Sequence, residues 1–256
     1  MDLGLKGKKA VVTGGSRGIG RAIADLLAEE GADVAICARN AEQVAEAVRA
    51  LEAKGVKAFG KAVDIADGPA IRAFVKEAGD TLGGIDVMVS NASALVQGAA
   101  EDDWRAMFEI DILGAVRTFE AARPFLEKAG ETHGDAAFLI TSSVSAAEAA
   151  NASSYGAMKA ALIHYAKGLA RENAAKHIRA NVVSPGTVFF EGGVWGNVKA
   201  GMPQFFEQMI KRNPTGRMAT PEEVAAATVF LASPRSAFTT GINMLVDGAI
   251  SSRVNY

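Results

Sequence analysis

The chain has 256 residues, of which 27 are Lys or Arg and 29 are Asp or Glu, so its formal net charge is −2. With 49% hydrophobic and 22% charged residues, the composition excludes a disordered chain and a protein that binds nucleic acid mainly through positive charge. The single cysteine, Cys37, excludes an intrachain disulfide and a four-cysteine zinc site.

Short apolar runs rich in β-branched residues alternate with segments in which apolar residues recur every three or four positions. Because each run is apolar throughout, it is expected to be buried on both faces of a parallel sheet covered by helices. Right-handed crossovers then predict one doubly wound α/β domain over 1–256, since a closed barrel would place its phosphate site late in the chain. The seven predicted strands lie at 10–13, 34–37, 58–63, 85–89, 138–141, 182–183 and 244–246.

One stretch interrupts this alternation. Residues 186–220 mix glycines with large apolar side chains such as Phe189, Trp195 and Phe206. An insertion of this kind in a compact domain is typical of a lid or binding loop. We predict a substrate lid over 188–215; the alternative is a helical hairpin packed on an oligomer partner.

A glycine-rich motif, 13–20, follows the first predicted strand and opens the next helix. Its glycines, at 14, 18 and 20, allow a tight turn and close approach to a pyrophosphate, whose charge the free N–H groups and the helix dipole would hold. The spacing is Gly-x3-Gly-x-Gly rather than the common Gly-x-Gly-x2-Gly.

Residues 14–18 of this motif also match the Gly-x-Ser-x-Gly nucleophile elbow of α/β-hydrolases. That elbow follows a central strand, whereas this motif follows the first one. None of the three histidines, His133, His164 and His177, lies in an obvious strand-end loop. We therefore favour a dinucleotide site over a hydrolase.

The second predicted strand ends at Cys37 and is followed by Ala38 and Arg39. A free ribose 2′-hydroxyl is normally met here by Asp or Glu, and a 2′-phosphate by Arg. No acidic residue is present at position 38, and Arg17 in the glycine-rich motif supplies a second guanidinium that can bracket a phosphate. The sequence therefore predicts NADP(H) rather than NAD(H).

Tyr155 and Lys159 are four residues apart in a predicted helix, which places phenol and ammonium on one face. An isolated phenol has a pKa near 10 and is a poor acid at pH 7, but a nearby cation favours the phenolate. Such a phenol can give a proton to a carbonyl oxygen while hydride reaches the carbon, or take it back during oxidation.

Together these motifs resemble the short-chain dehydrogenase/reductase family of about 250 residues, and the likeness runs along essentially the whole chain. It rests on 13–20, Asp64, 90–93, Ser142 with Ser143, Tyr155 with Lys159, 184–186, 216–223 and 246–248. The resemblance implies a Rossmann-like fold, NADP(H) and a homo-oligomer, either a dimer or a homotetramer. It also implies that Lys159 holds the nicotinamide ribose and tunes Tyr155. The other implied cofactor-binding residues are Gly14, Ser16, Arg17, Gly18, Ile19 and Gly20 at the phosphates, Arg39 at the 2′-phosphate, Asp64 and Ile65 at the adenine, Asn91 and Ala92 at the ribose, and Pro185, Gly186 and Val188 at the nicotinamide.

Four departures from the family pattern change what is expected of the site. Ser93 replaces a glycine, which predicts that its loop lies further from the cofactor. Asp111 stands where the family commonly has a catalytic Asn; it can accept a proton from water, and as a buried anion it would alter neighbouring titrations. Phe190 replaces a Thr, so Thr187 or backbone atoms must serve the carboxamide. The catalytic serine is Ser142 by its distance from Tyr155 and Ser143 by local pattern, and we favour Ser143.

The predicted activity is carbonyl reduction or alcohol oxidation. NADPH delivers hydride to a ketone, Tyr155 protonates the developing alkoxide, and the serine stabilises it by a hydrogen bond. No metal is expected. A 3-oxoacyl thioester and a small cyclic or polyol ketone are both candidate substrates, and a catalytically idle NADP-binding sensor or scaffold is the alternative.

Residues 1–9 resemble no signal peptide and no run approaches a membrane span of roughly 20 residues, so a cytoplasmic protein is expected.

Overall fold

A computed structural model describes residues 2–149 and 151–254. Its core is one seven-stranded sheet of order β3-β2-β1-β4-β5-β6-β7 in which every paired neighbour is parallel. The doubly wound sheet predicted from the sequence is confirmed. The strands are β1 (Lys9–Thr13), β2 (Asp33–Ala38), β3 (Ala58–Ala62), β4 (Val87–Ser90), β5 (Ala136–Thr141), β6 (Ile178–Pro185) and β7 (Asn243–Val246).

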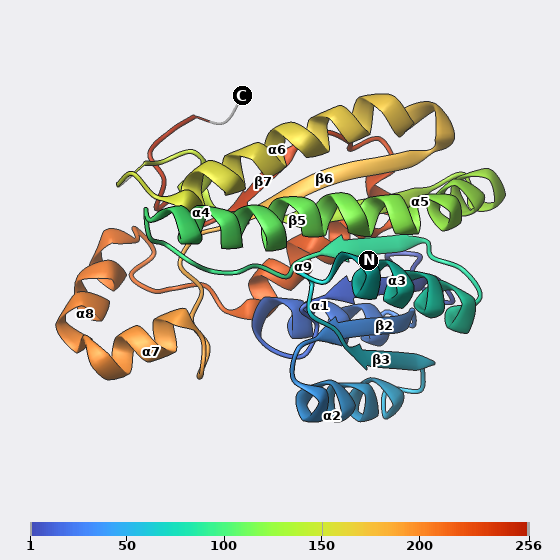
Figure 1. The fold of residues 1–256 in the computed structure, drawn as a ribbon, viewed down its shortest axis with the longest axis horizontal. Coiled ribbons are helices and arrows are strands. Elements are labelled where there is room, and N and C mark those ends of the chain that lie inside the picture. Colours follow the sequence, from blue (N-terminus) through green and yellow to red (C-terminus); the bar gives the residue numbers. More distant parts are fainter. Residues whose placement is uncertain (1, 150, 255–256) are drawn as a thin grey trace.

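Helices cover both faces of this sheet (Figure 1). One face packs against α3 (Gly68–Leu82), α5 (Gly114–His133) and α6 (Ser154–Asn173). The other face packs against α1 (Gly18–Glu29), α2 (Ala41–Glu52) and α9 (Pro221–Ala232). Neighbouring residues of a strand divide between the two layers: Met88 lies in the first core, and Val87 and Val89 lie in the second.

The expectation that every strand is buried on both faces is wrong for the two edge strands. β3 and β7 are only partly buried, because each has a neighbouring strand on one side only. β6 begins four residues before its predicted start. It includes two polar residues, Arg179 and Asn181, that are buried because their side chains bond to Asp135 and to backbone carbonyls.

The long front helix is built from three parts. α4 (Glu101–Met107) continues into a π-helical segment, η1 (Phe108–Leu113), which leads directly into α5. A π-helical turn contains an extra residue and therefore rotates the side chains that follow it. In η1, this turn places the carboxylate of Asp111 in the buried interior rather than in solvent.

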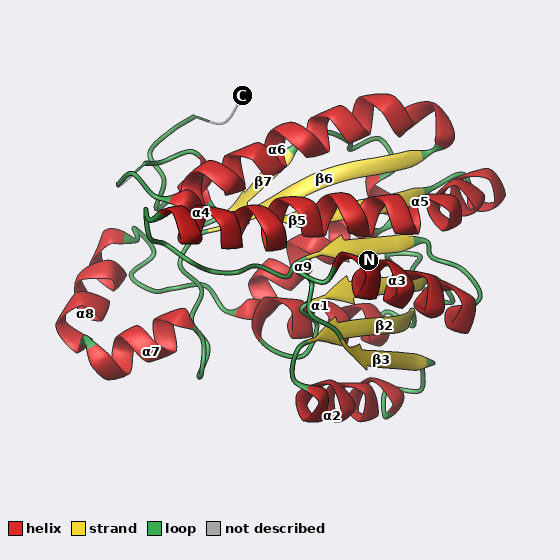
Figure 2. Ribbon diagram, viewed as in Figure 1, coloured by secondary structure: helices red, strands yellow, loops and turns green. Residues whose placement is uncertain are grey.

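The insertion after β6 forms two helices, α7 (Val194–Gly201) and α8 (Pro203–Arg212). They lie beyond the sheet on the side to which the strand arrows point (Figure 2). The carboxyl ends of the strands therefore face this helix pair. Among the described residues, no helix is long and apolar enough to cross a membrane.

Candidate active site

The glycine-rich turn lies at the carboxyl end of β1, between β2 and β4, where the winding of the sheet reverses. Ligands of open α/β sheets bind at such a switch point. Gly14 and Gly18 adopt φ of +66° and +54°, which favours glycine at both positions. A Cβ at Gly20 would lie 2.2 Å from the carbonyl oxygen of Gly14, so no larger residue fits. No side chain caps the first turn of α1, and that turn holds no acidic residue, so its N–H groups suit an anion.

The loop after β4 packs directly on this turn. The Asn91 side-chain amide donates to the carbonyls of Thr13 and Gly14 at 3.2 and 3.3 Å, and its Oδ1 accepts from the Thr141 hydroxyl. A Cβ at Gly14 would lie 3.2 Å from the Cα of Ala92. The Thr13 hydroxyl accepts from the backbone N–H groups of Asn91 and Ala92 and holds them against the turn. The expected effect of Ser93 on the distance from this loop to the cofactor stays a prediction.

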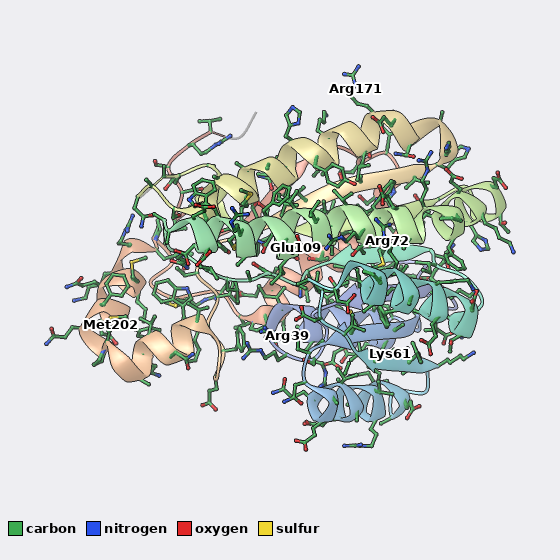
Figure 3. The ribbon with its side chains drawn as sticks, viewed as in Figure 1. Arg39, Lys61, Arg72, Glu109, Arg171 and Met202 are labelled. Atoms are coloured by element: carbon green, nitrogen blue, oxygen red, sulfur yellow. The ribbon has the colours of Figure 1, made fainter. Side chains whose placement is uncertain are left out.

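The two predicted phosphate-binding arginines are both exposed near this edge. Arg39 directly follows β2 and lies on the side of the molecule that faces α7 and α8 (Figure 3). Arg17 donates from Nη1 to the carbonyl of Gly192 at 3.0 Å, so it also ties the glycine-rich turn to the insertion. The Ser16 hydroxyl contacts Gln43 of α2 at 3.5 Å and has no histidine partner among the described residues, as the hydrolase alternative would require.

Two further predicted cofactor residues follow β3. Asp64 is exposed, and its Oδ1 accepts from the backbone N–H of Ala66, which shapes the turn before α3. Ile65 is buried, and its Cγ2 would lie 2.5 Å from a Cβ at Gly114. Because β2 and β3 are parallel, both residues follow the same carboxyl edge of the sheet as Arg39.

Tyr155 and Lys159 lie on one face of α6, as their spacing predicts. The ammonium of Lys159 is 5.6 Å from the centre of the Tyr155 ring. It donates to the carbonyl of Thr141 at 3.0 Å, and its Nζ lies 2.9 Å from Oδ1 of Asp111. Tyr155 is half-buried, whereas Lys159 and Asp111 are each only 2% exposed. The phenol thus lies beside a cation that the fold itself holds in place.

The two candidate serines have different surroundings. The Ser142 hydroxyl is buried and donates to the backbone carbonyl of Lys159 at 2.8 Å, so it joins β5 to α6. The Ser143 hydroxyl oxygen accepts from the N–H of Ser145, and its own hydrogen has no acceptor in the part of the chain that the structure describes. This difference favours Ser143 as the serine that is free to bond a substrate.

The residues after β6 extend toward the same edge. Gly186 donates to the carbonyl of Val246, and Val188 forms an isolated bridge with Ala219. The Val188 side chain lies in the core on the α1 and α9 face, so the extended chain directs Thr187 to the opposite, α6 face. The Thr187 hydroxyl is buried and has no hydrogen-bond partner among residues 2–149 and 151–254. A buried hydroxyl without a partner is unfavourable unless a ligand completes it.

The insertion contacts the glycine-rich turn in a way that the sequence did not reveal. The Phe190 ring lies against Gly18, since a Cβ there would be 2.5 Å from its Cζ. Phe189 meets Phe206 edge to face at 5.6 Å, and the Lys199 ammonium lies 5.1 Å from the Phe189 ring centre. The sequence signalled only the aromatic content of this stretch. The lid over 188–215 stays a prediction, while its α7–α8 portion has the helical form that the alternative expected.

These features fit the cofactor expected from the resemblance. A Cβ at Gly14 or Gly20 would fill the turn, the first N–H groups of α1 are uncapped, and the buried Thr187 hydroxyl lacks a partner. Burial raises the pKa of the Cys37 thiol to about 12, so this residue behind the turn is no nucleophile. The described residues contain no group of three or more His, Cys, Asp or Glu side chains that could hold a metal ion.

Comparisons with known proteins agree on one family and one fold. A family profile described as enoyl-(acyl carrier protein) reductase matches residues 14–251. The chain is 36% identical over 255 residues to isoepoxydon dehydrogenase patN of Penicillium expansum, covering 98% of this chain and 97% of that protein. It is 33% identical over 259 residues to the 3-oxoacyl-[acyl-carrier-protein] reductase FabG of Chlamydia pneumoniae, covering 98% and 100%.

Solved structures with the same fold align over nearly the whole chain. L-sorbose reductase from Gluconobacter frateurii, in complex with NADPH and L-sorbose, aligns with a TM-score of 0.91 at 31% identity, covering 99% of this chain and 100% of that one. RhlG of Pseudomonas aeruginosa, an NADP active-site complex, aligns with a TM-score of 0.88 at 31% identity, covering 97% and 98%.

Proposed function

Since the chain belongs to the short-chain dehydrogenase/reductase family of oxidoreductases and its cofactor is NADP(H), we propose that it interconverts a ketone and a secondary alcohol with Tyr155 as acid and base. The observation that carries this proposal is the Tyr155–Lys159 pair, with 5.6 Å between ammonium and ring centre, at the edge where the glycine-rich turn also lies.

The chain's own residues would divide the work as follows. NADPH, when bound, supplies the hydride that reduces the carbonyl carbon. The Tyr155 hydroxyl gives its proton to the carbonyl oxygen, and Lys159 stabilises the phenolate that remains. Ser143 donates its free hydroxyl hydrogen to the same oxygen. In the oxidation direction each residue acts in reverse, so Tyr155 takes the proton back.

The residues expected to hold NADP(H) follow the carboxyl edge. The turn between β1 and α1 would bind the pyrophosphate, Arg39 and Arg17 the 2′-phosphate, and Thr187 with the Val188 backbone the carboxamide. Thr187 would take over a contact that Phe190, which has no hydroxyl, cannot make. The buried hydroxyl that lacks a partner supports this assignment.

The substrate is proposed to lie between the catalytic groups and the insertion. Aromatic residues of the insertion would cover its apolar part, and Glu148 in the loop after Ser143 would offer a polar contact; its Oε1 accepts from the Ser252 backbone at 2.6 Å. One relative is named for a 3-oxoacyl-carrier substrate and another for isoepoxydon. Two substrate classes are therefore proposed, a 3-oxoacyl thioester and a small cyclic or polyol ketone.

A homo-oligomer, a dimer or a tetramer, is also proposed. Trp104 and Phe108, four residues apart on the α4–η1 helix, are 37% and 46% exposed. A second copy packed on this helix would cover both rings. Light scattering at micromolar concentration should give at least twice the monomer mass, and a sharp monomer would contradict this part of the proposal.

A catalytically idle NADP-binding protein is the second candidate, because Asp111 and Ser93 depart from the family pattern. Retention of Tyr155, Lys159 and Ser143 argues against it, since a binding module needs no such phenol. A spectrophotometric screen of NADPH and NADH against acyl, cyclic and sugar ketones tests both. Turnover of at least one ketone with NADPH is expected, whereas tight NADPH binding with no turnover across the panel would favour the idle protein.

A further inference from the structure

The lysine of the proposed catalytic pair does not act as a free cation in this chain. Oδ1 of Asp111 lies 2.9 Å from the Lys159 ammonium, and the two side chains are 0% and 2% exposed. Within the described part of the chain, Oδ1 accepts no hydrogen bond, so its contact with Lys159 is an ion pair whose angles do not suit a hydrogen bond. Oδ2 of Asp111 accepts from the backbone N–H of Ala94 at 2.9 Å. One carboxylate thus joins α6 to the loop after β4.

The local fold brings Asp111 to this position. It lies in η1, the π-helical segment between α4 and α5, and such turns are frequent at functional sites. Burying two charges costs free energy that only close pairing and additional hydrogen bonds offset. Here the offset comes from the ion pair, from the Thr141 carbonyl on Lys159 and from the Ala94 amide on Asp111. A neutral Asn would need no such pairing.

The groups in contact with the ammonium come from identified elements. α4 also packs on α6, but its charged residues Glu101, Asp102 and Arg105 are exposed. α6 contributes Tyr155 and Lys159 itself, and η1 contributes Asp111. β5 contributes only the carbonyl of Thr141, and the loop after β4 contributes only the amide of Ala94, which reaches Asp111. Beside Tyr155, the described ion pair therefore carries no net charge.

We propose that Asp111 is a positioning residue that holds Lys159 and, by cancelling its charge, weakens the electrostatic support that Lys159 gives to the Tyr155 phenolate during the reaction. This inference rests on the proposed function. A cation near a phenol favours the phenolate, and an anion added beside that cation opposes it. An ammonium whose charge is cancelled by Asp111 gives less support to the phenolate that forms when Tyr155 gives up its proton.

The test is Asp111→Asn, which has nearly the same shape and removes the charge; its single oxygen can accept from either the Lys159 ammonium or the Ala94 amide, but not from both. The pH dependence of kcat/KM for alcohol oxidation should shift so that half-maximal rate occurs about one pH unit lower, the scale of removing one unit charge a few ångström beyond the ammonium. Asp102→Asn, on the exposed first turn of α4, is the matched control and should leave the profile unchanged.

A second variant separates charge from geometry. Asp111→Glu keeps the negative charge in a displaced position, so its kcat is expected to fall while its pH profile stays close to that of the parent protein. Equal losses of kcat in Asp111→Asn and Asp111→Glu, with neither profile moved, would overturn the proposal and leave Asp111 a structural residue. A shift of the Asn variant toward higher pH would also overturn it.

A turnover-free measurement keeps this result distinct from the proposed function. The tyrosinate absorbance of the NADP-bound protein is titrated with pH, and Tyr155→Phe identifies the part of the signal that belongs to Tyr155. Asp111→Asn should move that part down by about one pH unit. If no ketone is turned over but the absorbance titration moves, the proposed activity is wrong and the role of Asp111 is supported. If a ketone is turned over and the absorbance titration does not move, the proposed activity is supported and the role of Asp111 is wrong.

Discussion

The buried polar network around Lys159 and the α7–α8 helix pair are held in place in opposite ways. Lys159, Asp111 and Ser142 are at most 3% exposed and are joined to β5 and to the loop after β4 by an ion pair and hydrogen bonds. No residue of α7 is buried and only Phe206 of α8 is, and its neighbours Met202 and Phe205 are 54% and 44% exposed.

This difference indicates a division of labour between the two regions. Proton transfer needs groups fixed within fractions of an ångström, which a buried polar network on regular elements provides. Substrate selection needs a surface that can change without loss of the fold. The helix pair is held by ring contacts such as that of Trp195 on Phe205 at 6.2 Å, and its low burial predicts the lower local stability that such a surface needs.

The largest effect is expected from Tyr155→Phe, which keeps the ring and removes the acid. The rate of ketone reduction should fall by about a thousandfold or more, because a positioned acid contributes roughly 10²–10⁴. NADPH binding, followed by fluorescence, should stay within about twofold of the parent. An unchanged rate of ketone reduction in Tyr155→Phe would contradict the assignment of Tyr155 as the acid.

The next effect concerns the cofactor's 2′-phosphate. Arg39→Ala should raise KM for NADPH by about 10–100-fold, the range of a charge-assisted hydrogen bond, and should leave KM for NADH nearly unchanged. Arg49→Ala, also exposed and carried on α2, is the control expected to alter neither. Equal losses for both cofactors after Arg39→Ala would exclude a phosphate contact.

Two substitutions, one in the α7–α8 helix pair and one in the buried core, test the comparison between an exposed and a buried region. Trp195→Ala should lower kcat/KM for bulky ketones by about tenfold, as a lost aromatic contact would, with little change in Tm. Phe138→Ala, in β5 and fully buried, should instead lower the free energy of unfolding by about 3–5 kcal/mol. If Trp195→Ala destabilised the fold and left substrate kinetics unchanged, the helix pair would be a structural element.

A smaller effect is expected at Thr187. Replacement by Val keeps the shape and removes the unpaired hydroxyl, so the fold should be as stable or slightly more stable in the absence of cofactor. The Kd for NADPH should rise by about fivefold, the value of one neutral hydrogen bond. Thr187→Ser should keep most of the affinity. No change in Kd for the Val variant would show that the hydroxyl does not meet the cofactor.

The smallest effect is expected at Cys37, whose pKa burial raises to about 12. Native protein at pH 8 should resist alkylation, and unfolded protein should react quickly. Because this pKa lies above its unfolded value, near 9, the contribution of Cys37 to stability is present below pH 9 and is lost as pH rises toward 12. Rapid labelling of the native thiol would show that the core behind the glycine-rich turn opens readily.

Much of this architecture follows from local sequence patterns. The apolar runs located all seven strands. For the five inner strands the reason is that a strand inside a parallel sheet must be apolar on both faces. Tyr155 and Lys159 could be paired from their spacing, since four residues make about one helical turn. The glycine-rich motif could be placed at a strand end for the same local reason.

Other features depend on contacts between distant segments and could not be predicted. Asp111 and Lys159 are far apart in the sequence, and only the π-helical turn and the packing of α6 bring them to 2.9 Å. The hydrogen bond that occupies Ser142 depends on the position of the Lys159 carbonyl. The early start of β6 was missed because Arg179 reads as a surface residue until Asp135 and three backbone carbonyls pair with it.

The central claim is that this chain transfers hydride from NADPH to a ketone while Tyr155 supplies the proton. The most direct measurement uses NADPH deuterated at the transferring carbon and follows the product by mass spectrometry, with the parent protein and Tyr155→Phe in parallel. The account predicts one deuterium on the carbinol carbon for the parent protein and almost none for the variant. Deuterium transfer at equal rates in both would contradict the account, as would no transfer to any ketone despite saturating NADPH binding.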